Sequence, residues 1–183
     1  MINSIRQLEQ DLRDLLMERG HHSFPKRQWY QLVAPLDNVG DTTLAIASYQ
    51  RSGIGRATGT KYLRLFGYLQ SVYLQQDSIE FLSNVLTGQW ADPEHGTGWA
   101  ALRLLRNQIG GHPAERAAAV ARITMSSRGF KIVHWESWGP KFEDIDLHGL
   151  HRRYVAEAAA ILNSVVDTVK IQNDPVGNSG HEA

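Results

Sequence analysis

The residues best suited to chemistry in this chain lie in one short segment, RNQIGGHP at positions 106–113. Glycine is the usual residue just past the end of a helix, so the two glycines are expected to stop a helix here. Pro113 disfavours the α conformation for His112 and fixes a kink at that point. Arg106 and Asn107 are therefore expected to lie close to His112. A guanidinium binds phosphate through paired hydrogen bonds, and an imidazole moves protons near neutral pH.

This pair of groups suits the cleavage of RNA by its own 2′-hydroxyl. A base takes the proton from the 2′-hydroxyl, an acid protonates the leaving 5′-oxygen, and a cation stabilises the charged phosphorane. Two alternatives remain open on the residues alone. Arg106 can simply complement the dipole of a Gly-capped helix, with His112 in a solvent-facing linker. The pair can also bind RNA without cutting it.

The order Arg106, Asn107 and then His112 resembles the signature of the HEPN superfamily, small all-helical domains that are widespread in prokaryotic toxins and defence systems. That signature is Arg, often followed by Asn or another polar residue, and then His four to six residues later. A long helix expected just before the segment is also similar to HEPN architecture. The resemblance covers about residues 60–170, but residues 1–40 and the segment 121–136 lie outside it, which leaves the subfamily open.

The resemblance implies a metal-independent RNA endonuclease that is a homodimer, in which the motifs of two chains form one cleft. His112 from each chain would supply the base and the acid, and paired Arg106 side chains would bind the phosphate. Asn107 would orient the imidazole or bind a phosphate oxygen. No cofactor is implied, and an antitoxin or defence-system protein is a possible partner. The alternative is a non-catalytic RNA-binding or protein-interaction module of a toxin–antitoxin or defence system.

The net charge of zero conceals a gradient along the chain. Residues 42–135 carry 10 basic and 5 acidic side chains, whereas residues 136–183 carry 4 basic and 8 acidic ones. A basic middle segment attracts a polyanion if its charges share one face, unless the acidic C-terminal part folds back and neutralises them. We expect further RNA contacts from basic residues of this segment and of a glycine-rich stretch at 52–60: Arg51, Arg56, Lys61, Arg103 and Arg116.

Two other sets of residues carry weaker hypotheses. Asp144, Asp146, His148 and His151 could be metal ligands, as could His21-His22, but a helix cap with solvated charges is favoured and no metal site is predicted. Trp90, Trp99, Trp135 and Trp138 could stack on bases, although such residues more often lie in a core or interface.

The elements that must position these residues are mainly helices. Apolar periodicity predicts a helix ending at Gly20, one long helix or two joined helices over 62–86, a helix over 98–109 and a last helix over 147–171. Residues 20–40 read as an irregular connection, with a modest helix after Asp41. A short helix is expected over 114–121, and a small β-hairpin over 121–136 that turns at 127–129. The fold class is thus mainly α: a HEPN-like helical bundle with a small β-hairpin.

Length and composition bound the remaining possibilities. At 183 residues, with 42% hydrophobic and 21% charged side chains, the chain fits one globular domain. We place that domain at 1–172, with a disordered tail at 173–183. Cysteine is absent, which excludes disulfides and Cys-type metal sites. No stretch is apolar enough for a membrane helix and the first residues are charged, so a cytoplasmic location is expected.

Overall fold

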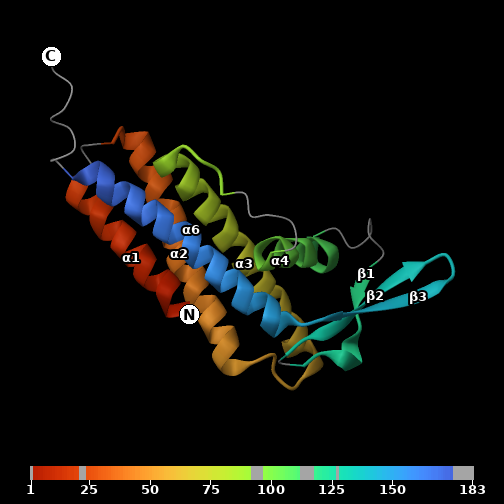
Figure 1. The fold of residues 1–183 in the computed structure, drawn as a ribbon. Helices are drawn as coiled ribbons and strands as arrows, with labels where there is room; N and C mark the ends of the chain where they lie inside the picture. The colour runs from red at the N-terminus through yellow and green to blue at the C-terminus, as the bar shows by residue number, and fades with distance from the viewer. Residues whose placement is uncertain (1, 21–23, 92–96, 112–117, 127, 175–183) are drawn as a thin grey trace, which may run out of the picture.

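The computed structural model describes residues 2–20, 24–91, 97–111, 118–126 and 128–174. Within these ranges it contains five α-helices and one antiparallel sheet of three strands. Four long helices lie side by side: α1 (Ile2–Arg19), α2 (Lys26–Ser52), α3 (Thr58–Thr87) and α6 (Leu147–Asn173) (Figure 1). The shorter α4 (Gly98–Arg106) crosses them near one end, close to the sheet. The mainly helical class predicted from the sequence is confirmed.

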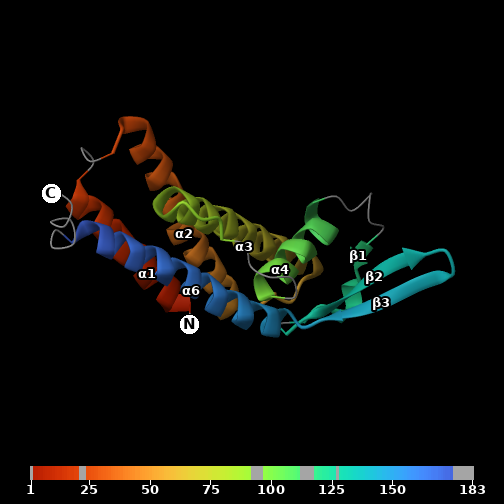
Figure 2. The same cartoon turned by 45° about the horizontal axis from the view of Figure 1, so that its top comes forward.

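The sheet projects from one end of the bundle, as both views of the ribbon show (Figure 2). Its strands are β1 (Ala118–Val120), β2 (Phe130–Glu136) and β3 (Gly139–Ile145), in the spatial order β1-β2-β3. The residues Phe130 and Ile132 are buried against the bundle, whereas β3 is largely exposed. Of the described helices, none combines the length and apolar character needed to cross a membrane.

The predicted irregular connection over 20–40 is wrong from Lys26 onward, because α2 runs unbroken from Lys26 to Ser52 with Pro35 inside it. A proline removes one helical hydrogen bond and normally breaks a helix. Here the apolar face of α2 packs mainly on α3 and α1, which outweighs that cost. Its fully or nearly fully buried residues are Leu32, Leu36, Val39 and Ile46.

The predicted short helix and hairpin also need correction. Residues 118–120 form strand β1 instead of the end of a helix, while 114–117 lie outside the described residues. The alanines of β1 favour a helix locally, but antiparallel pairing with residues 132–134 of β2 overrides that preference. The tight hairpin joins β2 to β3 through Ser137 and Trp138, and β3 was not predicted. The long helices α3 and α6, and the end of α1 at Arg19 before Gly20, agree with the predictions.

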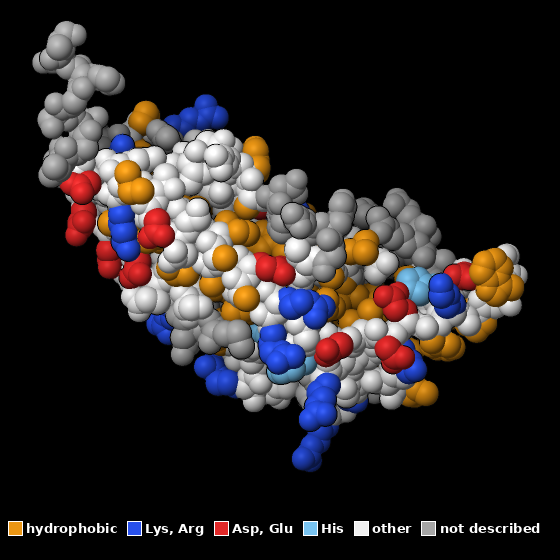
Figure 3. Space-filling model, viewed as in Figure 1, with side chains coloured by type: hydrophobic (Ala, Val, Ile, Leu, Met, Phe, Trp, Pro, Cys, Tyr) orange, Lys and Arg blue, Asp and Glu red, His pale blue; other side chains and the backbone are white. Residues whose placement is uncertain are grey.

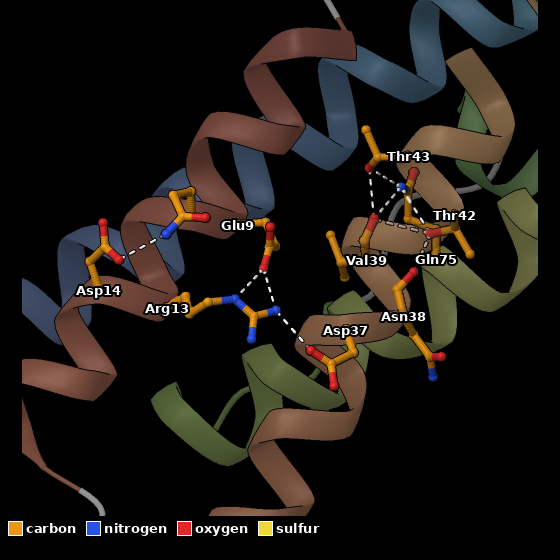
Figure 4. A network of polar contacts seen from close by, with 10 residues as sticks. Glu9, Arg13, Asp14, Asp37, Asn38, Val39, Thr42, Thr43 and Gln75 are labelled. Atoms are coloured by element: carbon orange, nitrogen blue, oxygen red, sulfur yellow. Dashed lines mark hydrogen bonds and ion pairs between the residues drawn. The ribbon is translucent and has the colours of Figure 1, made fainter. Parts of the chain in front are cut away.

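Buried polar side chains fix how the long helices meet (Figure 4). The Gln75 amide of α3 donates to the carbonyl oxygen of Val39 at 3.3 Å and to the hydroxyl oxygens of Thr42 and Thr43 at 3.2 and 2.8 Å. Its own oxygen accepts a hydrogen bond from the Tyr154 hydroxyl of α6 at 2.7 Å. Because every polar atom of this buried amide has a partner, it joins α2, α3 and α6 in one register.

An ion-pair network joins α1 to α2 (Figure 4). Arg13 contacts the buried carboxylate of Glu9 at 2.7 Å and Asp37 at 3.0 Å. The two carboxylates raise the pKa of Arg13, against the opposing effect of its partial burial. Together the two polar clusters hold α1, α2, α3 and α6 in the arrangement on which α4 rests.

Candidate functional site

Arg106 is the last residue of α4, and its side chain contacts α3 (Thr58–Thr87). Its Nε and Nη2 donate to the amide oxygen of Gln70 at 3.3 and 3.1 Å, and its Nη1 donates to the amide oxygen of Asn107 at 3.1 Å. The guanidinium carbon lies 4.3 Å from the centre of the Tyr73 ring. Every one of these partners is uncharged, so they orient the guanidinium without neutralising it.

Helix α4 reaches this position because both of its ends are anchored. The Thr97 hydroxyl accepts a hydrogen bond from the Ala100 backbone N–H, which caps the helix. The Glu157 carboxylate of α6 accepts from the backbone N–H groups of Gly98 and Trp99 at 3.0 and 2.7 Å. The apolar side chains of Trp99, Leu102 and Leu105 are buried. Arg103 and Arg106 lie four residues after Trp99 and Leu102, so they adjoin this buried face where α4 meets α3.

Arg103 lies one turn before Arg106 but has a different environment. Its Nη2 contacts the carboxylates of Asp77 at 2.6 Å and Glu80 at 3.2 Å, and its Nε donates to the amide oxygen of Gln76 at 3.2 Å. The structure thus places Arg103, a predicted RNA contact, in an ion-pair network. With two carboxylate partners, Arg103 holds α4 on α3 and has little net charge to offer a phosphate.

The two glycines of the motif do not stop the helix as predicted. The regular α-helix ends at Arg106, and a π-helical turn, Asn107–Gly111, continues through both glycines. Such turns are uncommon and frequently occur at functional sites. A pocket of about 290 Å³ lies beside this turn, and it is lined by Phe66, Leu69, Gln70, Arg106, Ile109 and Gly110. The Arg106 guanidinium is therefore next to an open space of small-molecule size.

The predicted catalytic partner His112 and the predicted RNA contact Arg116 lie outside the described residues. The side chains of the consecutive residues Arg106 and Asn107 are joined by a hydrogen bond. Gln70 and Tyr73, the other two partners of Arg106, were missed in the sequence. Gln70 is a polar position and Tyr73 an apolar position of the long periodic helix, and neither shows that another helix will cross there.

The remaining predicted RNA contacts are distributed over the neighbouring region. Arg51 and Arg56 are exposed at and after the end of α2. Lys61 lies within α3 instead of in the glycine-rich loop, and its ammonium donates to the Met125 carbonyl oxygen at 3.0 Å. Figure 3 shows basic and acidic side chains interspersed on the face that it draws, so on that face the charges do not form a field of one sign.

The carboxylates and histidines that could be metal ligands have other roles in the structure. Asp144 pairs with Lys131 at 3.2 Å, Asp146 caps α6 by accepting from the Gly149 N–H, and His151 is buried. Among residues that the structure describes, no group of three or more His, Cys, Asp or Glu is placed to hold a metal ion. The pair His21-His22 lies outside them.

The tryptophans divide between core and surface. Trp99 is fully buried against Tyr154 and its indole N–H donates to Glu80, so it is a core residue. Trp90, Trp135 and Trp138 are exposed by 64, 63 and 82%, the last two at the outer end of the β2–β3 hairpin. Their proposed base stacking stays a prediction.

The chain matches no protein-family model, no curated protein and no solved structure. The assignment of function therefore depends on the chemistry of the residues around Arg106 and on the resemblance of its motif.

Proposed function

We propose that the protein binds and cleaves RNA at a site built around Arg106, and that two chains share that site. The observation that supports this best is the set of partners of Arg106. Its guanidinium contacts two amide oxygens and an aromatic ring, and among the described residues no carboxylate forms an ion pair with it. A cation that is oriented but not neutralised suits the binding of a phosphate anion.

The comparison with Arg103 strengthens the proposal. Both residues lie on one helix and both approach the Tyr73 ring, at 5.1 and 4.3 Å. Arg103 has two carboxylate partners, as an arginine with a structural role normally has. If Arg106 served only to attach α4 to α3, a carboxylate would serve as well as Gln70 at that position.

The reaction follows from the groups of the motif. His112 of one chain accepts the proton of the ribose 2′-hydroxyl while the 2′-oxygen attacks the adjacent phosphorus. The bond from phosphorus to the 5′-oxygen breaks, and His112 of the second chain donates a proton to that oxygen. Arg106 stabilises the charge of the phosphorane, and Asn107 holds the Arg106 guanidinium in place. The products are a 2′,3′-cyclic phosphate and a free 5′-hydroxyl.

The first experiment is the cleavage of a mixed RNA pool in EDTA by the unaltered protein and by Arg106→Ala and His112→Ala. We expect cyclic phosphate ends from the unaltered protein and a loss of roughly 100-fold or more in either variant, the usual effect of removing a group that stabilises charge in the transition state. Arg27→Ala, which removes an exposed charge at the far end of α2, is the control and should cleave normally.

A second variant tests the observation itself. Gln70→Glu keeps the hydrogen-bonding shape beside Arg106 but adds a carboxylate that neutralises it. We expect this variant to remain folded and to lose most of its cleavage. If the unaltered protein binds RNA without cutting it, the non-catalytic alternative holds instead. If it neither binds nor cuts any RNA in the pool, the proposed function is wrong.

A further inference from the structure

The β2–β3 hairpin distributes its side chains over the two faces of the sheet in an unusual way. Residues that pair directly across two strands lie on the same face. Phe130 and Ile132 are buried against the bundle, so they and their partners define the inner face of the sheet. An antiparallel sheet with one face on a core normally presents polar side chains on its other face.

The outer face of this hairpin is apolar instead. Val133 pairs with Phe142, and Trp135 pairs with Pro140. Because these residues alternate along the strands with those of the inner face, they lie on the outer face. Trp135 and Phe142 are exposed by 63 and 57%, and Trp138, in the turn, is exposed by 82%. These three exposed aromatic residues form what we call the aromatic end of the hairpin.

The inner face carries charged groups where it extends past the buried residues. His134 contacts Glu143 at 3.0 Å, and Lys141 contacts Glu136 at 3.8 Å. In the part of the hairpin that leaves the bundle, the polar side chains therefore lie on the inner face and the apolar ones on the outer face. This arrangement indicates that something other than water covers the outer face.

The charges of the hairpin argue against a polyanion as that partner. Residues 130–145 contain two basic and three acidic side chains. Lys131 pairs with Asp144 at 3.2 Å, and Lys141 pairs with Glu136, so both basic side chains have carboxylate partners. A surface with a slight negative excess attracts neither the phosphates of RNA nor an anionic membrane.

The aromatic end is also too small to join two copies of this chain by itself. An aromatic side chain contributes about 150–250 Å², so the exposed parts of the three amount to roughly 300–500 Å². A stable interface buries about 800 Å² on each partner. Exposed apolar patches of roughly 300–600 Å² are nevertheless often functional in monomeric proteins.

The place of the hairpin in the fold points to a lipid surface. The hairpin projects from the bundle in both ribbon views, with its turn furthest from the helices (Figures 1 and 2). Tryptophan is enriched where a membrane meets water, because its ring is apolar and its N–H is polar. Segments with one apolar and one charged face lie in that interface without crossing the bilayer.

We propose that the aromatic end of the β2–β3 hairpin inserts into a zwitterionic lipid surface, with the paired charges of the inner face directed towards water. This inference does not depend on the proposed ribonuclease activity.

The test mixes the full chain with vesicles of phosphatidylcholine and measures the bound fraction by flotation. We expect half of the protein to be bound at a lipid concentration on the order of 1 mM, which is weaker binding than a single myristoyl chain gives. The tryptophan emission should shift to shorter wavelengths on binding, since exposed indole rings leave water.

Three serine variants test the role of the hairpin. Trp135→Ser and Trp138→Ser should each lower the vesicle affinity roughly tenfold, because each removes a large apolar side chain from the lipid contact. Trp90→Ser is the matched control, since Trp90 is exposed by 64% but lies after α3, outside the hairpin. It should bind vesicles as the unaltered protein does. All three positions are exposed, so the Tm should stay the same.

Four results would each overturn the proposal. The first is that no protein floats at ten times the expected lipid concentration. The second is that Trp138→Ser binds vesicles as well as the Trp90→Ser control. The third is that binding requires phosphatidylserine and is lost at high salt, which would show attraction by charge. The fourth is that Trp138→Ser weakens the binding of single-stranded RNA and leaves vesicle binding unchanged, which would show that the aromatic end stacks on bases.

Discussion

Histidine side chains show most clearly how the surroundings of a residue decide its role. His134 lies near the surface and contacts Glu143 at 3.0 Å. His151 lies three residues from His148 on one helix, yet His148 is exposed and His151 is buried between Tyr68 and Gln50. The spacing alone was also consistent with a pair of metal ligands, although a helix cap was favoured. Only the packing of α2 and α3 against α6 shows that both ring nitrogens of His151 are used within the protein.

The lowered pKa of His151 predicts a specific pH dependence of stability. In the unfolded chain a histidine has a pKa of about 6.5, whereas burial, with a smaller effect of His148, lowers the pKa of His151 to about 4. Between these values the unfolded chain binds a proton that the folded protein excludes. Stability is therefore complete above pH 6.5 and declines as the pH falls towards 4, by about 3 kcal/mol in total.

This dependence is measured by urea unfolding at a series of pH values. The variant His151→Gln keeps a neutral polar side chain and cannot titrate, so its free energy of unfolding should fall less steeply between pH 7 and pH 4.5. Parallel curves for the two proteins would show that His151 does not carry the effect.

At the scale of elements, the placement of α4 decides whether the motif can work at all. The helix is short, and its first turn is held by a carboxylate from α6. Gly98 lies so close to α6 that a Cβ there would be 2.5 Å from the Tyr154 backbone nitrogen. Glu157 and Gly98 fix the first turn of α4 and thereby help to position Arg106, which is at the other end of the helix.

We expect Glu157→Ala to lower the free energy of unfolding by about 1–3 kcal/mol, because it leaves the N–H groups of Gly98 and Trp99 buried without an acceptor. Glu157→Gln retains one oxygen and should lose less. Urea unfolding measures both, and Glu18→Ala, at an exposed position of α1, should stay within about 0.5 kcal/mol of the unaltered protein. A Glu157→Ala protein as stable as the Glu18→Ala control would contradict this role of Glu157.

At the scale of the whole molecule, the surroundings of Arg106 predict how two chains would meet. Leu63, Phe66 and Leu74 of α3 are exposed, and with Gln70 they fall on one side of the helix. This exposed stripe contains the side chain to which Arg106 is bonded. A second copy that covered the stripe would bring its own Arg106 close by, as the shared site of the proposed function requires.

We therefore expect a homodimer of twice 20.5 kDa, about 41 kDa, in sedimentation equilibrium. Leu74→Glu places a charge in the stripe and should give a monomer that no longer cleaves RNA. Leu44→Glu, at a similarly exposed leucine of α2, should remain a dimer. A monomer at all concentrations, or a dimer unaffected by Leu74→Glu, would contradict this interface.

The sequence by itself determined the elements whose periodicity is long. The apolar repeats of α1, α3 and α6 predicted their extents to within a few residues, because a helix of many turns needs one continuous apolar face. It also singled out Arg106 and Asn107 by type and order, since the chemistry of a side chain does not depend on the fold.

Only the tertiary structure decided the rest, and in each case the reason is a contact between residues distant in the chain. Burial against α3 and α1 keeps α2 helical through Pro35. Antiparallel pairing with β2 makes the alanines of β1 adopt a strand conformation. Carboxylates of α3 neutralise Arg103, whereas amide oxygens leave Arg106 charged. The order of residues in the chain does not show which side chains of different helices contact one another. These roles can therefore be assigned only when the packing of the helices is known.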